Sequence, residues 1–213
     1  SKALSIRKKV FGDESIYAAV TYHNLGNVHR DQEDYGRAVE YLNKCKDIYL
    51  KSSSETDPSL ITVYNSLGLV HALQEKYSDS ESYFLKSLDL TEKIYGSIHP
   101  ELVNTLWNLA NTTQNQKKYD EALNFLNRIE DLYTKIEPED DEQPVNLFQQ
   151  IGSIYVQKGD SEKALEYYNK ALKVLTELYG EEDERVRELK NNIVKANVLN
   201  TMSSLNKKNF EKK

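Results

Sequence analysis

The sequence of 213 residues has one cysteine, one methionine, one tryptophan and four prolines. A single cysteine cannot form an intramolecular disulfide, so we expect Cys45 to be a buried structural thiol, which fits an intracellular compartment. No run approaches the roughly 20 apolar residues that span a bilayer, and no charged segment followed by an apolar one opens the chain. We therefore expect a cytoplasmic protein without membrane insertion.

Catalytic and nucleic-acid-binding signatures are also missing. The sequence has no phosphate-binding P-loop, no Gly-rich dinucleotide turn, no H-E-x-x-H and no Cys-x-x-Cys pair. His29 and His71 are expected to be half-buried packing residues, and His99 to lie in a turn before proline. The pI near 5.4 and the absence of a basic stripe disfavour nucleic acid. We expect a protein that is not an enzyme and has no cofactor, metal site or nucleic-acid partner.

What the sequence does have is a repeat of 42 residues. An aliphatic residue followed by a small one recurs at this step, at Leu25-Gly26, Leu67-Gly68, Leu109-Ala110 and Ile151-Gly152. Counted from Ala19, positions 8 and 20 of each repeat are small, and position 24 is large, at Leu42, Phe84, Leu126 and Tyr168. Small residues at both places let two antiparallel helices approach closely, so each repeat is predicted to be a helix pair.

Apolar residues within each half of the repeat follow helical spacing, which predicts an amphipathic helix with one buried stripe. We expect first helices near 19–32, 58–74, 100–116 and 143–158, and second helices near 35–51, 77–94, 119–135 and 161–178. Gly12, Gly96 and Gly180 are expected to form left-handed caps, and Pro58 and Pro100 to begin first helices. The length allows one or two compact domains, but stacked repeats favour one elongated array.

The 42-residue pattern is that of a tetratricopeptide repeat (TPR), stretched beyond the usual length. The segments that carry the likeness are ALSIRKKVFG at 3–12, HRDQEDY at 29–35, TLWNLANTTQNQKKYDEAL at 105–123 and KALEYYNKALKVLTELYG at 163–180. They resemble the repeats of kinesin light chain; similar long repeats occur in cell-polarity adaptors and ciliary proteins. The resemblance implies an all-α fold, an α-α superhelix or TPR solenoid of antiparallel helix pairs.

The register also divides the chain. Residues 1–18 are expected to hold the second helix of a truncated preceding repeat and a turn, which makes the chain a fragment of a longer array. The four repeats are predicted at 19–60, 61–102, 103–144 and 145–181. Residues 182–205 are predicted to form a capping helix, with a buried stripe that includes Val186, Leu189, Ile193, Val194, Val198 and Met202. A polar tail at 206–213 is expected to fray.

The candidate site is the concave groove that the first helices of such an array line. Positions 2, 5, 6, 9, 12 and 13 of each repeat fall away from the buried stripe and are expected to face it. The groove residues predicted in this way are His23, Asn24, Asn27, Arg30, Thr62, Asn65, Ser66, Leu69, Asn104, Trp107, Asn108, Asn111, Gln114, Asn146, Gln149, Gln150, Ser153, Asn191, Asn192 and Lys195.

Amides dominate this set, and an amide can both donate to and accept from the backbone of an extended peptide. In the resembled families, asparagines at positions 5 and 6 hold extended peptides, which implies this role for Asn24, Asn65, Asn108, Asn191 and Asn192. The alternative is that the asparagines are solvated residues of a polar helix face. Trp107 is either an anchor for a ligand side chain or a packing residue against a neighbouring repeat.

Charge gives a further expectation. The turns 55–57, 137–142 and 181–184 hold eleven acidic residues and no basic ones, and we expect them to form an acidic rim. Such a rim beside more basic helices would suit an acidic peptide, steered by Arg30 and Lys195; alternatively, it only promotes solubility.

The sequence thus predicts a non-catalytic scaffold or adaptor that binds an extended peptide or a partner helix in the groove, as a cargo adaptor like kinesin light chain would. The alternative is a structural subunit of a large ciliary or cytoskeletal assembly, associated with the cilium or the cytoskeleton.

Overall fold

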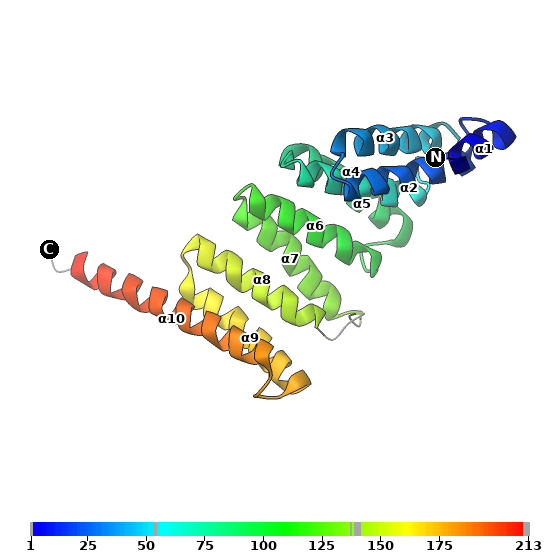
Figure 1. Ribbon diagram of the computed structural model, residues 1–213. Helices are drawn as coiled ribbons and strands as arrows, with labels where there is room; N and C mark the ends of the chain where they lie inside the picture. Colours follow the sequence, from blue (N-terminus) through cyan, green and yellow to red (C-terminus); the bar gives the residue numbers. More distant parts are fainter. Residues whose placement is uncertain (1, 53–54, 137, 139–141, 211–213) are drawn as a thin grey trace. The chain divides into compact units, whose positions relative to one another are not determined.

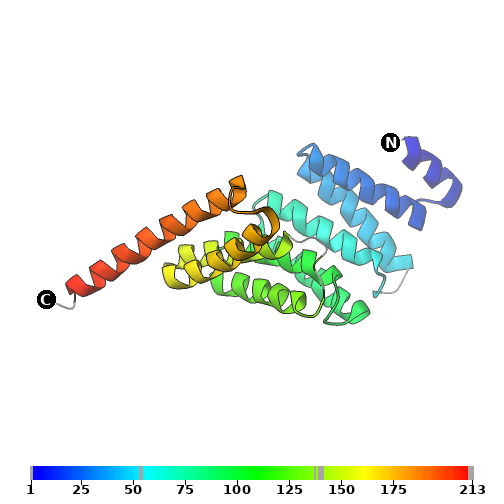
Figure 2. The same ribbon diagram turned by 90° about the horizontal axis from the view of Figure 1, so that it is seen from below.

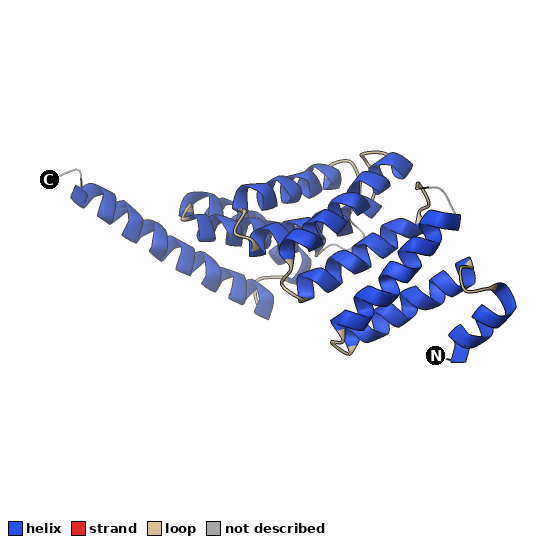
Figure 3. Cartoon of the chain, turned by 90° about the horizontal axis from the view of Figure 1, so that it is seen from above, coloured by secondary structure: helices blue, strands red, loops and turns tan. Residues whose placement is uncertain are grey.

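The computed structural model describes residues 2–52, 55–136, 138 and 142–210. The described residues form helices and no strand (Figure 1, Figure 3). The helices are α1 (Lys2–Phe11), α2 (Ile16–Asp31), α3 (Tyr35–Ser52), α4 (Ser59–Leu73), α5 (Tyr77–Tyr95), α6 (Glu101–Asn115), α7 (Tyr119–Tyr133), α8 (Gln143–Lys158), α9 (Ser161–Tyr179) and α10 (Glu184–Phe210).

These bounds confirm the predicted alternation of first and second helices. The largest difference is at α2, which begins at Ile16 rather than at residue 19. Its start is set by Ser15, whose hydroxyl accepts a hydrogen bond of 3.2 Å from the backbone N–H of Ala18. A serine at this position satisfies one of the unpaired donors of the first turn.

The chain divides into two compact units, residues 1–118 and 119–213. In the first unit, α2 pairs with α3 and α4 with α5, and the pairs join through contacts of α3 with α4 and of α5 with α6. In the second unit, α8 and α9 form a pair, α7 packs against α8, and α10 packs against α9 (Figure 2). The boundary lies in the turn after α6, inside the predicted repeat 103–144.

Small residues at position 8 form notches that the large residue at position 24 fills, as the register predicts. A Cβ atom added to Gly26 would lie 2.7 Å from Cγ of Leu42, and one added to Gly68 would lie 2.7 Å from the Phe84 ring. The same relationship holds in the second unit, where a Cβ atom on Gly152 would lie 2.7 Å from the ring of Tyr168. Glycine is therefore needed at position 8 mainly because the large side chain of the second helix, rather than its backbone, occupies the space of a Cβ atom.

Aromatic stacking also joins the two helices of three pairs, α2 with α3, α4 with α5, and α8 with α9. His29 stacks on Tyr41 with ring centroids 5.3 Å apart, and His71 stacks on Tyr83 at 5.4 Å. In the second unit Tyr155 stacks on Tyr167 in the same register, at 5.9 Å. The prediction that His29 and His71 are half-buried packing residues is confirmed.

The turns between first and second helices contain residues with a left-handed backbone, which the sequence does not predict. Glu33, Glu75 and Lys117 have φ angles of 60°, 59° and 61°, and Gly159, in the same register, has a φ of 78°. Left-handed backbone is costly for residues with a Cβ atom, by about 1–3 kcal/mol. Three of the four turns therefore store strain that the fourth avoids.

The glycines that were predicted to cap helices have the expected positive φ, but they do not adopt the left-handed helical conformation. Gly96 and Gly180 end α5 and α9 with φ of 84° and 80°, but with ψ of 176° and 168°. These values lie outside the left-handed helical region, in an extended region that is essentially restricted to glycine. The prolines follow expectation, because α4 and α6 begin directly after Pro58 and Pro100.

The last helix differs from its prediction in two respects. It runs to Phe210, past the expected end at residue 205 and through much of the tail that was expected to fray; residues 211–213 lie outside the described part. Val186 and Leu189 are buried as expected, but Val194 and Val198 are 59% and 53% exposed, because α10 packs against α9 along one narrow stripe. The side chain of Met202 lies outside the described residues.

The cysteine is confirmed as a buried thiol. Cys45 has no exposed surface, and its burial raises the pKa of the thiol to about 12. Within the described ranges, no helix is both long and apolar enough to cross a membrane.

Candidate functional site

Each unit has a hollow between two consecutive first helices; in the second unit α10 takes the place of a first helix, because its residues follow those of α8 at the step of 42. Hollow A, in the first unit, has a volume of about 200 Å³ and lies between α2, α3 and α4. It is lined by Val20, His23, Tyr49, Ser59, Thr62 and Val63. Hollow B, in the second unit, has a volume of about 210 Å³ and lies between α8, α9 and α10. It is lined by Glu142, Val145, Asn146, Gln149, Leu175, Arg185, Glu188, Leu189 and Asn192.

The two hollows occupy the same place in the repeat. Every residue that lines hollow A has a counterpart in hollow B at a distance of 126 residues, which is three steps of 42. The pairs are Val20 with Asn146, His23 with Gln149, Tyr49 with Leu175, Ser59 with Arg185, Thr62 with Glu188, and Val63 with Leu189. Positions 2 and 5 of a first helix thus form one wall, position 31 of the second helix the floor, and the next first helix the opposite wall.

Hollow A is uncharged. Burial, and secondarily Arg30, lower the pKa of His23, so its imidazole is neutral near pH 7. Its Nε2 atom lies 2.9 Å from the hydroxyl of Ser66 on α4, a hydrogen bond that crosses between the first helices. Burial raises the pKa of Tyr49, and a hydrogen bond from Ser59 opposes this shift.

Hollow B, in contrast, is charged. Arg185 forms ion pairs with Glu142 at 2.6 Å and with Asp183 at 2.9 Å, and its guanidinium lies 3.5 Å from the centre of the Tyr179 ring. Hydrogen bonds from Arg185 lower the pKa of Asp183 to about 2. The guanidinium is therefore already engaged by two carboxylates and one aromatic face.

Three of the side chains that line hollow B are amides. Asn146, Gln149 and Asn192 make no side-chain hydrogen bond within the described part of the chain. Each was predicted to face the groove, and the structure brings them together from α8 and α10. Amides without an internal partner can donate to and accept from a ligand.

Between the first helices α4 and α6, the position that corresponds to hollows A and B contains a direct hydrogen bond between the two helices. The amide of Asn65 donates to the hydroxyl of Thr105 at 3.2 Å, and the contact from that hydroxyl to Oδ1 of Asn65 is 3.3 Å. Asn65 therefore joins two first helices, as His23 does through Ser66. Both residues were predicted to face a ligand, and the structure gives them a bond inside the protein.

The remaining predicted residues fall into two groups. Some bond to neighbours on their own unit: Arg30 pairs with Asp31 at 2.7 Å and donates to Asn27 at 3.4 Å, Asn108 donates to Asn104 at 3.3 Å, and Ser153 contacts Gln157 and Tyr168. Asn24, Asn111, Asn191 and Lys195 are exposed, whereas Leu69, Trp107, Gln114 and Gln150 are half-buried. Trp107 is not among the residues that line hollow A or hollow B, and its assignment as an anchor stays a prediction.

One turn of the predicted acidic rim is largely compensated by neighbouring basic residues, and the rim as a whole stays a prediction. In the turn before α10, Asp183 pairs with Arg185, Glu182 with Arg187 at 3.3 Å, and Glu181 with Lys190. The basic residues of the following helix fold back on the turn, so three of its four carboxylates are locally compensated. Residues 137 and 139–141 lie outside the described part, and Arg30 is not a free cation because Asp31 holds it.

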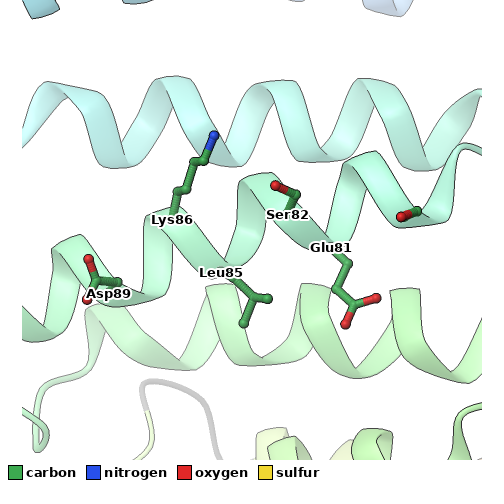
Figure 4. Close-up of a pocket in the computed structure, with 6 residues that line it drawn as sticks. Glu81, Ser82, Leu85, Lys86 and Asp89 are labelled. Carbon is green, nitrogen blue, oxygen red and sulfur yellow. The ribbon is translucent and has the colours of Figure 1, made fainter.

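A third, open recess lies on α5 and is lined by Ser78, Glu81, Ser82, Leu85, Lys86 and Asp89 (Figure 4). All six residues belong to one helix, so the recess has no opposite wall of its own. Glu81 accepts hydrogen bonds from Gln116 at 2.8 Å and Lys118 at 2.9 Å and is thereby occupied within the unit. Hollows A and B are therefore the better candidate sites.

Comparison with known families decides the architecture. A model of the tetratricopeptide repeat matches residues 1–51 and 59–135, and a second tetratricopeptide model matches residues 145–174. The chain belongs to the tetratricopeptide repeat family. Repeats of this family build protein-interaction scaffolds and are typically not catalytic, and the antiparallel pairs of this chain form such a TPR solenoid fold.

Solved structures with the same fold include proteins of the kinesin light chain class. BtubC (BKLC) from P. vanneervenii is 17% identical, with a TM-score of 0.76 over 86% of this chain and 73% of that one. The nearly identical TPR-like repeats assigned to a kinesin light chain of Podosopora anserina are 16% identical, with a TM-score of 0.74 over 90% of both chains. MamA is 17% identical, with a TM-score of 0.61 over 83% of this chain and 86% of that one.

These identities establish a common fold, which confirms the resemblance to kinesin light chain repeats at that level. A comparison with curated proteins finds no match.

Sequence reasoning predicted five of the fifteen residues that line the two hollows and missed the other ten. Tyr49, Ser59, Arg185 and Glu188 were not predicted, because attention to amides excluded residues of other types. The register could have identified three of them. Tyr49 is at position 31 of its repeat, and Ser59 and Arg185 each stand two residues before the start of a repeat, so these positions recur at the step of 42. Within the described residues, no group of three or more His, Cys, Asp or Glu side chains could hold a metal ion.

Proposed function

We propose that this tetratricopeptide chain is a non-catalytic adaptor that binds extended peptides along its first helices, at hollow A and hollow B. The observation that carries the proposal is the register equivalence of the two hollows. Pockets that recur at the same repeat positions, each walled by consecutive first helices, are suited to accept side chains of an extended segment. The unpartnered amides of hollow B add donors and acceptors for its backbone.

The finer form of the proposal is a cargo adaptor of the kinesin light chain kind, in the cytoplasm and associated with the cytoskeleton or the cilium. The fold shared with BtubC and the Podosopora repeats supports the architecture that such an adaptor needs. In this form the ligand is a short linear segment of another protein, and binding is reversible.

The proposal is tested by selecting peptides from a random 12-residue library displayed on phage, with the purified chain as bait. Enriched peptides are synthesised, and their dissociation constants are measured by fluorescence anisotropy. The double variant Asn146→Ala, Gln149→Ala removes two amides from hollow B, and Asn169→Ala, the control, removes an exposed amide of α9 that does not line the hollow. We expect about a tenfold loss with the double variant, because each lost hydrogen bond costs about 0.5–1.5 kcal/mol, and no change with the control.

The same peptides are measured against Trp107→Ala and Asn108→Ala in the first unit. A loss with either variant supports ligand binding by α6. If no peptide is enriched over an empty support, the proposed function is wrong.

The alternative is a structural subunit with permanent contacts in a ciliary or cytoskeletal assembly. The first unit exposes Val10, Phe11 and Tyr17, at 63%, 53% and 56%, which favours a contact surface at α1 and α2. This alternative predicts that the purified chain self-associates and enriches no peptide, whereas the adaptor is monomeric in sedimentation and enriches peptides.

A further inference from the structure

The lining of hollow B combines buried apolar side chains with a polar rim. Val145, Leu175 and Leu189 are buried at 2% exposure each. Asn146, Gln149 and Asn192 form part of the rim and have no internal partner within the described residues. The volume of about 210 Å³ equals that of about seven liquid waters, which is room for one long side chain.

The charges around hollow B favour a cation. Two carboxylates, of Glu142 and Glu188, line it against the single guanidinium of Arg185. Arg185 is already paired with Glu142 and Asp183, whereas Glu188 forms no ion pair within the described part of the chain. The nearby cations of Arg187 and Lys190 are held by Glu182 and Glu181. The carboxylate of Glu188 is therefore the charge that is available to a ligand.

Hollow A provides an internal comparison. Thr62 occupies the register of Glu188, and Ser59 occupies that of Arg185, so the same fold position has no charge in the first unit. The floor also changes, from Tyr49 in hollow A to Leu175 in hollow B. The two hollows therefore present different side chains to a ligand, uncharged in hollow A and charged in hollow B.

We infer that hollow B binds the side chain of a lysine or arginine from an extended peptide. The inference rests on the proposed function and names the chemistry of one ligand position. The ammonium or guanidinium group donates to the carboxylate of Glu188 and to the amide oxygens of Asn146, Gln149 and Asn192. The methylene stem of the same side chain lies on Leu175 and Leu189, as long cationic side chains do on apolar surfaces. This assignment is the opposite of the acidic peptide that the overall charge pattern suggested.

The test uses peptides that the wild-type chain enriches from the random library. We expect lysine or arginine at one fixed position in the peptides that lose affinity in the Asn146→Ala, Gln149→Ala variant. Glu188→Gln should weaken their binding about tenfold, because the neutral amide no longer forms a charge-assisted hydrogen bond with the cation of the ligand. Glu177→Gln, which removes an exposed carboxylate from α9, is the matched control and should change nothing.

A charge exchange makes the test independent of folding. Glu188→Lys should bind the original peptide poorly and should prefer a peptide in which the fixed lysine is replaced by glutamate. Circular dichroism confirms that each variant remains helical. If peptides are enriched without a basic preference, or if Glu188→Gln binds them like the wild-type chain, the inference about hollow B is wrong and the proposed function stands. If no peptide is enriched, both fail.

Discussion

The imidazole of His23 on α2 lies 2.9 Å from the hydroxyl of Ser66 on α4, from Nε2 to Oγ. These residues occupy position 5 of one repeat and position 6 of the next, and their bond ties two consecutive first helices together. In the second unit the same positions hold Gln149 and Asn192, for which the described residues show no such bond. The same pair of positions thus links two helices in the first unit, whereas in the second unit it leaves two amides available to a ligand.

Two half-buried histidines make the stability depend on pH. The pKa values of His23 and His71 are lowered chiefly by burial, so the unfolded chain binds protons more tightly than the folded one. Their contribution is fully present above the unfolded pKa of about 6.5 and is lost as the pH falls below it. We expect the midpoint of urea unfolding to be lower at pH 5.5 than at pH 7.5.

His23→Gln removes one of the two titrating groups and should reduce this difference. A pH dependence between 5.5 and 7.5 that is the same in the variant and in the wild-type chain would contradict the assignment to His23.

The notch at Gly68 predicts a large effect from a single methyl group. In Gly68→Ala the new Cβ atom would lie 2.7 Å from the ring of Phe84, so the ring must move out of its packed position. Overpacking of this kind costs about 1–3 kcal/mol in the free energy of unfolding. The matched control is Gly36→Ala on α3, where the nearest atom is 3.9 Å away.

The control should stabilise the chain by about 0.5–1 kcal/mol, because alanine is the better helix former. Chemical denaturation of both variants measures the two effects, and a Gly68→Ala variant as stable as the wild-type chain would show that the notch is not tight.

The left-handed turn residues predict stabilisation by glycine. Glu75→Gly should raise the free energy of unfolding by up to about 1 kcal/mol, because glycine adopts a φ of 59° without the strain of a Cβ atom. At the same register, Gly159→Ala should lower it by about 1 kcal/mol. Gln74→Gly, one residue earlier at a φ of −84°, controls for the entropy of the unfolded chain and should destabilise. Equal effects of Glu75→Gly and Gln74→Gly would argue against strain at Glu75.

The thiol of Cys45 should be inert until the chain unfolds. A pKa of about 12 instead of 9.0 lowers the thiolate fraction at pH 8 about a thousandfold, and full burial excludes reagents as well. We expect a thiol-reactive disulfide reagent to label the native chain at least a thousandfold more slowly than the chain in urea. Labelling of the native chain at the rate of a free thiol would show that α3 opens readily.

The register predicted the helices and their packing because both depend on residues that repeat. Gly26 and Leu42, for example, follow from spacing alone, since one has to be small where the other is large. The strain at Glu33, Glu75 and Lys117 could not be predicted from residue type, because Glu and Lys do not mark left-handed turns. Only Gly159 is of a residue type that indicates a left-handed turn. Because the other three residues stand at steps of 42 from it, the same conformation could have been predicted for them.

The candidate site was predicted in outline and missed in detail. Asn146, Gln149 and Asn192 were expected in the groove and line hollow B, which the alternation of helix faces explains. That Asn65 would bond to Thr105 could not be foreseen, because the bond depends on the distance between α4 and α6. Ion pairs such as that of Arg185 with Glu142 join residues 43 positions apart, and their partners cannot be chosen from charge alone.

Val194 on α10 occupies the register of Gly26, Gly68 and Gly152 and is 59% exposed. In those three helices even one added carbon would collide with the opposing side chain at 2.7 Å, and valine adds three. Another helix could not join α10 in the way that α9 joins α8 unless it carried a small residue at position 24 or crossed at another angle. A single branched side chain on α10 thus prevents the helix pairing that is seen in the repeats. Replacing Val194 by glycine would remove this steric obstacle.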